Sequence, residues 1–276
     1  MRIGIDVGGT HTDAVVLDRQ SVVASTKVLT SANVRDGVVN ALDDVLEQSG
    51  VAHDQVEAVM IGTTQFTNAV IERRELAPTA IIRIALPAGE LVPPMIDWPE
   101  DIAAALGRHV YMVHGGRTYD GFPIAPIDDA EIDAAIDDIK VRGIRHIALS
   151  GVFSPSDPAQ EKLVAARVLA RIPDARITLS HKIGRMGLLE RENAALLNAS
   201  LLPLADKVVD SFRAALAERQ IGCPFYISQN DGTLMSAQFA AEFPALTFAS
   251  GPTNSLRGAS LLTQLDNAVV VDIGGT

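Results

Sequence analysis

Two copies of one short motif, separated by almost the whole chain, constrain the fold of this sequence more than any other feature. Residues 4–10 read Gly-Ile-Asp-Val-Gly-Gly-Thr, residues 270–276 read Val-Val-Asp-Ile-Gly-Gly-Thr, and each copy follows an apolar run. A strand that ends in this way places a carboxylate beside glycines whose backbone N–H groups can approach an anion closely. The pattern therefore predicts two strand-to-turn elements that hold one phosphate-bearing ligand from two sides.

The residue types of the motif suit a nucleotide and its cation. Mg²⁺ prefers carboxylate, water and phosphate oxygens, so we expect Asp6 and Asp272 to hold hydrated Mg²⁺. A single Asp-x-Gly-Gly-Thr is also compatible with an ordinary hairpin turn, and the phosphate interpretation depends on the second copy. The residues assigned to phosphate binding, which include a glycine from a later turn, are Gly8, Gly9, Thr10, Thr12, Gly251, Gly274, Gly275 and Thr276.

The order of the expected elements predicts an α/β fold. Three strands rich in Val and Ile, at residues 3–7, 13–17 and 22–29, precede a helix at 34–48 and a buried strand at 56–61. This order is typical of a ribonuclease-H-like half-domain. Strands and helices then alternate over residues 127–179, which predicts parallel strands with helices packed on the sheet. We divide the chain into residues 1–86, an inserted α/β subdomain at 87–180, a remainder at 181–268, and 269–276 as the start of a second half.

Other segments carry more specific expectations. Six of the fourteen prolines fall within residues 87–126, which predicts mostly irregular backbone there. We expect the long helix that starts at Leu188 to kink or break at Pro203. Short apolar runs predict strands at residues 247–249 and 269–271.

Composition excludes some partners. The chain has 23 Lys and Arg against 34 Asp and Glu, a net charge of −11, and no basic run that would attract nucleic acid. No apolar stretch approaches the roughly 18 residues of a membrane span, and residues 2–6 are unlike a signal peptide. The single cysteine, Cys223, fits a reducing compartment. We expect a cytoplasmic protein with a small-molecule substrate.

Taken together, the motifs resemble the hydantoinase A/5-oxoprolinase family, within the superfamily of actin-like ATPases that includes acetate and sugar kinases and Hsp70. The similarity covers the whole chain, and its motifs occur in the family's order. The segments that carry it are 4–13 (GIDVGGTHTD), 62–69 (GTTQFTNA) with 72–74 (ERR), 229–236 (QNDGTLMS), 250–252 (SGP) and 271–276 (VDIGGT).

The resemblance implies the actin-like ATPase fold and the ATP-dependent opening of a cyclic amide, such as a hydantoin, 5-oxoproline or a related lactam. It also implies ATP and Mg²⁺ as cofactors, an oligomer, and a hydantoinase-B-like partner subunit. On this basis the catalytic candidates are Asp231 and Asp13, and the substrate-binding candidates are His11, Thr63, Thr64 and Asn68.

Simpler roles stay open for several of these residues. Thr63 or Thr64 could merely cap the helix that follows, Asp231 could form a turn with Asn230 and Gly232, and residues 250–252 could be a structural turn.

The chain departs from the family in three respects. It has His11 where the family usually has Phe, and Thr253-Asn254-Ser255 where a glycine-rich stretch usually follows Ser-Gly-Pro. It also ends at Thr276, within the second motif, so we expect the second half-domain and the adenosine loop to be missing. Two alternatives therefore remain: a small-molecule kinase of the same superfamily, or a truncated, non-catalytic nucleotide-binding module.

Overall fold

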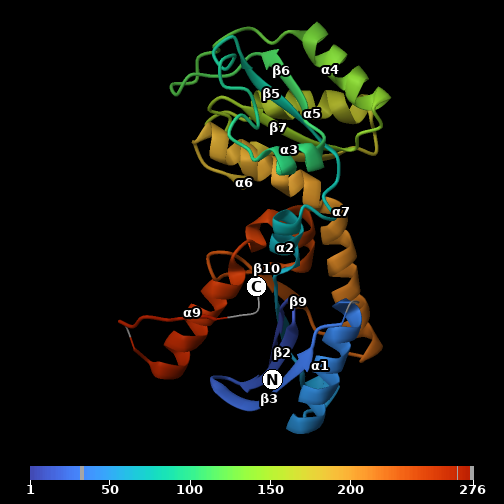
Figure 1. The fold of residues 1–276 in the computed structure, drawn as a ribbon, viewed down its shortest axis with the longest axis vertical. Coiled ribbons are helices and arrows are strands. Elements are labelled where there is room, and N and C mark those ends of the chain that lie inside the picture. Colours follow the sequence, from blue (N-terminus) through green and yellow to red (C-terminus); the bar gives the residue numbers. More distant parts are fainter. Residues whose placement is uncertain (32–33, 266, 274–276) are drawn as a thin grey trace. The chain divides into compact units, whose positions relative to one another are not determined.

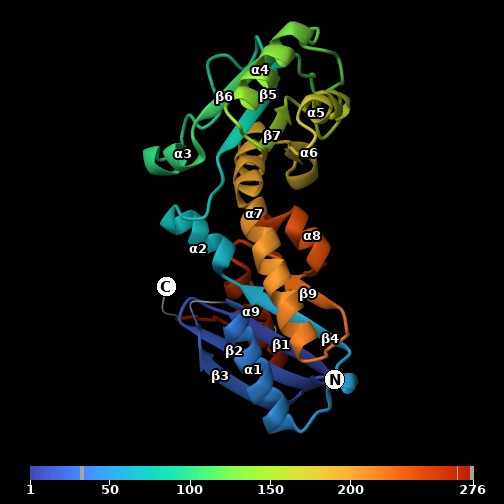
Figure 2. The same cartoon turned by 90° about the vertical axis from the view of Figure 1, so that its right-hand side faces the viewer.

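The computed structural model describes residues 1–31, 34–265 and 267–273. The chain forms two compact units (Figures 1 and 2). The first contains Met1–Ile71 and Leu204–Thr276, and the second contains Glu72–Pro203. The segment 87–180, predicted as an inserted subdomain, lies wholly within the second unit.

The first unit is built on a six-stranded mixed sheet with the order β10-β9-β4-β1-β2-β3. Strand β1 pairs antiparallel with β2 and parallel with β4, and β4 pairs parallel with β9. This arrangement confirms the three opening strands and the parallel return that the sequence predicts. The strands are β1 (Arg2–Val7), β2 (His11–Asp18), β3 (Ser21–Leu29), β4 (Ala58–Thr63), β9 (Phe225–Ser228) and β10 (Leu234–Ser236).

Helices cover the two faces of this sheet differently. On one face Ile3, Ile5 and Val7 of β1 are buried, and the amphipathic helix α1 (Val34–Ser49) packs there on β1, β2 and β3. Side chains alternate between the faces of a strand, so Gly4 and Asp6 lie on the opposite face. Helix α9 (Ser250–Thr263) packs against β4 and contributes to this second face. The short helices α2 (Gln65–Glu72) and α8 (Ala237–Glu242) complete the unit.

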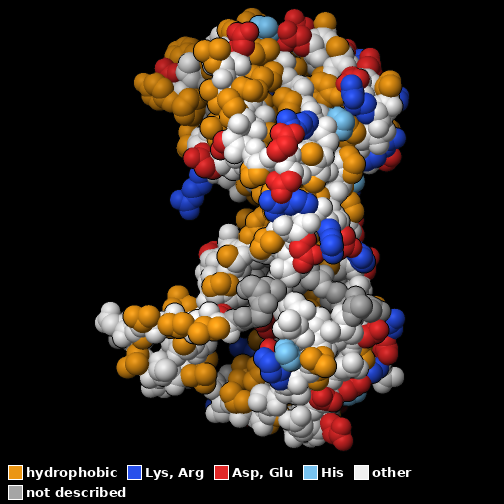
Figure 3. All heavy atoms as spheres, in the orientation of Figure 1, with side chains coloured by type: hydrophobic (Ala, Val, Ile, Leu, Met, Phe, Trp, Pro, Cys, Tyr) orange, Lys and Arg blue, Asp and Glu red, His pale blue; other side chains and the backbone are white. Residues whose placement is uncertain are grey.

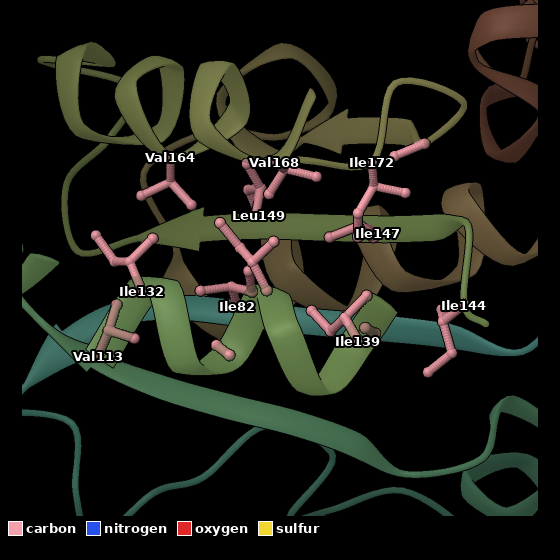
Figure 4. Packing of buried hydrophobic residues seen from close by; sticks show 14 of the residues in the cluster. Ile82, Val113, Ile132, Ile139, Ile144, Ile147, Leu149, Val164, Val168 and Ile172 are labelled. Atoms are coloured by element: carbon pink, nitrogen blue, oxygen red, sulfur yellow. The ribbon is translucent and has the colours of Figure 1, made fainter. Parts of the chain in front are cut away.

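The second unit has a fully parallel four-stranded sheet with the order β6-β5-β7-β8. Helices α4 and α5 bury Ile132 and Val164 against one face (Figure 4), and α3 and α7 bury Leu106 and Ala195 against the other. The elements are β5 (Thr79–Leu86), α3 (Glu100–Leu106), β6 (His109–His114), α4 (Asp129–Val141), β7 (His146–Gly151), α5 (Ala159–Arg171), β8 (Arg176–Leu179), α6 (Ser180–Ile183) and the part of α7 (Leu188–Glu218) up to Pro203; the rest of α7 belongs to the first unit.

Four local expectations are wrong or incomplete. Helix α7 continues through Pro203, so the predicted break there is absent. Helix α3 lies inside the segment 87–126, where mostly irregular backbone was predicted. Pro99 before it and the left-handed Gly107 after it are the sequence signals that mark its two ends. Residues 244–247 form a 3₁₀ turn in place of the strand predicted at 247–249, because a short apolar run does not distinguish a strand from a buried helical turn. Residues 269–271 pair with no strand in the described part of the chain.

Apolar side chains are exposed along the end of α9 and the segment that follows it (Figure 3). Leu262, Val269 and Ile273 are 72%, 92% and 88% exposed. Among the described residues, no helix is both long and apolar enough to cross a membrane.

Candidate functional site

A cleft of about 720 Å³ lies on the face of the first unit's sheet that α1 leaves uncovered. Its floor includes a row of four residues from four neighbouring strands. Strand pairing sets Gly62 beside Asp6, Asp6 beside Asp13, and Asp13 beside Lys27. Asn254 and Arg257 of α9 form part of its wall. The cleft therefore combines carboxylates and a lysine from the sheet with an amide and an arginine from α9.

Gly62 leaves room for the Asp6 carboxylate. A Cβ atom at position 62 would lie 2.5 Å from Asp6 Oδ1 and 3.1 Å from Asn254 Nδ2. The first distance is shorter than real Cβ contacts, so only a glycine fits without moving the carboxylate. Asp6 and Asn254 thus meet above Gly62, although they are far apart in the sequence.

The carboxylates of the cleft influence one another. Withdrawal from bulk water raises the pKa of Asp6, the nearby charges of Asp13 and Asp272 raise it further, and Lys27 lowers it. Asp13 is paired with Lys27, with Lys27 Nζ 3.1 Å from Asp13 Oδ1. Asp272 is held from another direction, because Ser255 Oγ donates a hydrogen bond of 2.7 Å to its Oδ2 atom. The structure thus brings the aspartates of both motif copies within electrostatic reach.

The donor set of the cleft consists of hard oxygen atoms. The described residues contain no group of three or more His, Cys, Asp or Glu side chains arranged to hold a metal ion. Mg²⁺ commonly keeps several waters and uses only one or two carboxylates together with substrate phosphates. Asp6, the nearby Asp272 and the open cleft beside Asp6 therefore fit a hydrated Mg²⁺ that arrives with a polyphosphate.

The turn between β1 and β2 is the first predicted phosphate element. Gly8 N donates 3.0 Å to His11 O, and a Cβ on Gly8 would lie 2.9 Å from that oxygen, so the turn requires glycine. Gly9 and Thr10 are exposed at the tip, and His11 Nδ1 lies 3.2 Å from Thr10 Oγ1. The tip is thus an accessible loop on a short, tight hairpin.

Thr12 does not reach this tip. Its side chain is fully buried, and its Oγ1 atom lies 3.1 Å from Thr30 Oγ1. Thr30 in turn donates 2.9 Å to Gly8 O. The expectation that Thr12 binds phosphate directly is therefore corrected, because its buried hydroxyl supports the turn from below.

The residues after β4 adjoin the end of β1. Thr64 N donates 3.3 Å to Val7 O, Gln65 N donates 3.3 Å to Thr63 Oγ1, and Asn68 Nδ2 lies 3.4 Å from Thr64 Oγ1. Thr63 thus satisfies a backbone donor at the start of α2, the capping role left open above. Thr64 and Asn68 are half-buried beside the hairpin, and their role in substrate binding stays a proposal.

Asp231 lies in an exposed turn next to the cleft. Thr233 donates to Asp231 Oδ1 from its backbone N (2.8 Å) and its hydroxyl (2.6 Å). The Thr233 side chain and then its backbone N–H lower the pKa of Asp231. A lowered pKa makes a weaker base, which favours the turn role over general-base catalysis.

Of the four remaining phosphate-binding candidates, the structure describes one, Gly251. Gly251 is the second residue of α9, and a Cβ there would meet nothing within 4 Å, so its surroundings are open to a ligand. Gly274, Gly275 and Thr276 lie outside the described residues.

Sequence reasoning missed three residues of the cleft: Lys27, Asn254 and Arg257. Lys27 carried one local signal, a single charge within a Val-rich strand. Arg257 donates from Nη1 to Gly232 O, and Gly232 has a left-handed φ of +80°. A Cβ on Gly232 would lie 2.7 Å from Arg257 Cδ, so this glycine is needed for the approach of α9.

The first unit is an α/β unit built from both ends of the chain, and the sequence carries an Asp-x-Gly-Gly-Thr motif near each end, as expected for half of an actin-like ATPase fold. The sequence pattern of the hydantoinase/oxoprolinase N-terminal region matches residues 2–172, and that of hydantoinase/oxoprolinase matches residues 191–276. The chain therefore belongs to the hydantoinase/oxoprolinase family. This confirms the resemblance inferred from the motifs.

The relatives include characterised multi-subunit enzymes. The chain is 26% identical to the caprolactamase subunit alpha of Pseudomonas jessenii and 23% identical to the acetophenone carboxylase gamma subunit of Aromatoleum aromaticum. The two alignments include 100% and 99% of this chain, but the chain spans only 42% and 41% of the length of those proteins.

Solved structures confirm the fold. The crystal structure of the ATP-dependent caprolactamase from Pseudomonas jessenii matches with a TM-score of 0.82 at 24% identity, over 100% of this chain and 42% of that one. A nucleotide-free acetone carboxylase matches with a TM-score of 0.76 at 21% identity, over 95% of this chain and 40% of that one.

Proposed function

We propose that this protein uses ATP to open a cyclic amide, such as a lactam, a hydantoin or 5-oxoproline. The observation that carries the proposal is the proximity of Asp6 and Asp272, one from each motif copy: Asp6 lines the cleft, and Asp272 is close enough for its charge to raise the pKa of Asp6. Family membership and the similarity to an ATP-dependent caprolactamase support the choice of substrate class.

The residues of the cleft have distinct tasks in this proposal. Asp6 and Asp272 would hold hydrated Mg²⁺, which supplies charge neutralisation to the phosphates when it is bound. The hairpin tip at Gly9 and Thr10 would bind phosphate oxygens, and Lys27 compensates the negative charge of Asp13. Transfer of the terminal phosphate of ATP to the amide oxygen, with release of ADP, would activate the carbonyl carbon for attack by water. Departure of the ring nitrogen with a proton would then open the ring and leave an acyl phosphate, and a second water would hydrolyse this to the acid and inorganic phosphate. The chain contributes mainly by positioning and electrostatic stabilisation.

Product analysis tests the proposal. The complete protein, with any partner subunit, is incubated with ATP, Mg²⁺ and a panel of lactams, hydantoins, 5-oxoproline and sugars. We expect the ring-opened acid and inorganic phosphate in equal amounts. A stable phosphorylated product without ring opening would indicate a kinase, and ring opening that needs no ATP would overturn the proposal.

A non-catalytic module gives a different result. A complete nucleotide site with ATP at about 100 times Kd is stabilised by about 2.7 kcal/mol. The absence of ATP-dependent stabilisation in the complete protein would favour the non-catalytic alternative. We also propose a hydantoinase-B-like partner subunit, since two relatives are named as subunits of larger enzymes.

Gly62→Ala is expected to lower the activity while the protein still folds. The added Cβ displaces the Asp6 carboxylate, so we expect kcat to fall by about 10²-fold, as small misplacements of reacting groups can cause. Gly258→Ala is the matched control, because a Cβ there meets nothing within 4 Å and should leave kcat unchanged. Steady-state kinetics and thermal unfolding are measured on both variants. Equal kcat values for the two would show that Asp6 needs no such space.

Asp231→Asn tests whether Asp231 is a base. Asn keeps the Oδ1 acceptor that Thr233 uses, so the turn should survive and kcat/KM should fall less than about ten-fold. Loss of a general base would instead cost about 10²–10⁴-fold. A loss in that range, with unchanged thermal stability, would restore Asp231 to the catalytic residues.

A further inference from the structure

Three successive side chains of α9 contact the cleft and two segments outside its lining, the turn at Asn230 and the segment that carries Asp272. Thr253 Oγ1 donates 2.9 Å to Asn230 O in the turn that contains Asp231. Asn254 lines the cleft above Gly62, beside Asp6. Ser255 Oγ donates 2.7 Å to Asp272 Oδ2. Successive residues of a helix point about 100° apart, so one helical turn can reach all three places.

Asp272 depends on this helix for its position. The segment around it, residues 268–273, pairs with no strand in the described part of the chain. The Ser255 hydroxyl donates to one oxygen of its carboxylate, Oδ2. A donor on one carboxylate oxygen orients the group and leaves Oδ1 for another ligand.

Asn254 brings polarity to the cleft without charge. Its Nδ2 atom lies 3.1 Å from the position of a Cβ on Gly62, and that position is 2.5 Å from Asp6 Oδ1. An amide NH₂ can donate to a phosphate oxygen or to a bridging water. Being neutral, it neither pairs with Asp6 as a cation would nor adds to the repulsion between the carboxylates.

We propose that Ser255 and Asn254 are positioning residues of the nucleotide site. Ser255 orients Asp272 toward the hydrated cation, and Asn254 donates to the phosphate or its bound water next to Asp6. This inference rests on the proposed function and assigns to α9 the task of bringing the two motif copies into one site. The helix is thereby part of the site itself, and its polar turn at 253–255 helps to determine what the cleft accepts.

The test measures binding, apart from turnover. Mn²⁺ serves as the probe for the cation, with a non-hydrolysable ATP analogue as the nucleotide, and free Mn²⁺ is followed by electron paramagnetic resonance. We expect Ser255→Ala to weaken Mn²⁺ binding in the ternary complex by about 10–100-fold, the usual effect of removing an outer-shell partner. Ser255→Thr keeps a hydroxyl and should restore the affinity. Ser260→Ala, on the same helix but away from this cleft, is the control and should bind as the unmodified protein does.

Asn254→Ala should act on the nucleotide. We expect it to weaken binding of the analogue with or without Mn²⁺, whereas Ser255→Ala should act only when Mn²⁺ is present. Normal binding by both variants, in a protein that binds the analogue tightly, would overturn the inference and leave the proposed function intact. Failure of the unmodified protein to bind the analogue would overturn both. Equal losses of both affinities, together with lowered thermal stability, would indicate a merely structural role and overturn the inference.

Discussion

Replacing Asp6 by Asn is expected to remove most ATP-dependent turnover while making the ligand-free protein more stable. Asp6 lies between Gly62 and Asp13 in the row of residues that forms part of the cleft floor. Loss of one preorganised electrostatic contact typically costs about 10²–10³-fold in kcat. The opposite effect on stability follows from its environment. Withdrawal from water, Asp13 and Asp272 raise the pKa of Asp6, so its ionised form is less favourable in the folded state than in the unfolded chain.

The sign of this effect depends on pH. Above the ordinary carboxyl pKa of 3.8, ionised Asp6 destabilises the fold, and Asn removes that cost. Below that value the carboxyl is protonated in both states, so the advantage of Asn should disappear. Thermal unfolding of both proteins between pH 3.5 and pH 7.5 checks this, because the range extends from just below the ordinary carboxyl pKa to well above it.

Asp44→Asn is the matched control for the Asp6 variant. It removes the same charge from an exposed position on α1, on the far face of the sheet, and should change neither turnover nor stability noticeably. An Asp6→Asn protein that retains more than a tenth of the activity would contradict the assigned role. One that is less stable at neutral pH would contradict the electrostatic argument.

Glu192→Gln is expected to destabilise the second unit by about 3–5 kcal/mol, because it leaves a buried guanidinium without its counter-charge. Arg83 and Glu192 are both fully buried and form a bidentate pair, with Nε to Oε2 at 2.7 Å and Nη2 to Oε1 at 2.5 Å. Ser150 Oγ donates a further 2.6 Å hydrogen bond to Oε2. Glu192→Gln leaves the desolvation cost of burying Arg83 in place and removes the negative charge that offsets this cost.

The double variant Arg83→Met with Glu192→Leu should be more stable than Glu192→Gln, since it removes both buried charges together. Trp98, the single tryptophan of the chain, packs against the core of the second unit, so its fluorescence during urea unfolding reports on this unit. Asp174→Asn removes one partner of an exposed pair with Arg145 in the same unit and should leave the unfolding midpoint unchanged. A midpoint for Glu192→Gln equal to that of the unmodified protein would show that Arg83 finds another partner or reaches water.

Much of this fold was predictable because its signals are local. Apolar runs and tight turns placed the strands β1 (Arg2–Val7), β2 (His11–Asp18), β3 (Ser21–Leu29) and β4 (Ala58–Thr63) correctly to within a few residues. The turn between β1 and β2 also determines that Asp6 pairs with Asp13, since register follows from turn length. The failures at residues 247–249 and 269–271 have a common cause: an apolar run of three residues does not reveal whether a partner strand lies beside it.

Lys27 shows why the site was harder to predict than the fold. A two-residue turn at Arg19 and Gln20 would place Thr26 opposite Asp13 if β2 and β3 paired regularly. An irregularity between Val16 and Leu17 shifts the register by one residue and brings Lys27 to that position. Because side chains alternate, such a shift moves a side chain from one face of the sheet to the other. Local sequence patterns carry no clear sign of this bulge.

The repeated Asp-x-Gly-Gly-Thr by itself determined the strand and tight turn at the start of the chain and the presence of two motif carboxylates, and it predicted a phosphate-bearing ligand. Those properties follow from the conformational freedom of glycine and the chemistry of aspartate, which act over a few residues. Only the tertiary structure decided that Asp272 approaches Asp6, that Ser255 donates a hydrogen bond to it, and that Thr12 is buried beneath the turn. These contacts join residues that are far apart in the chain, so they depend on how helices and strands pack, which no local pattern encodes.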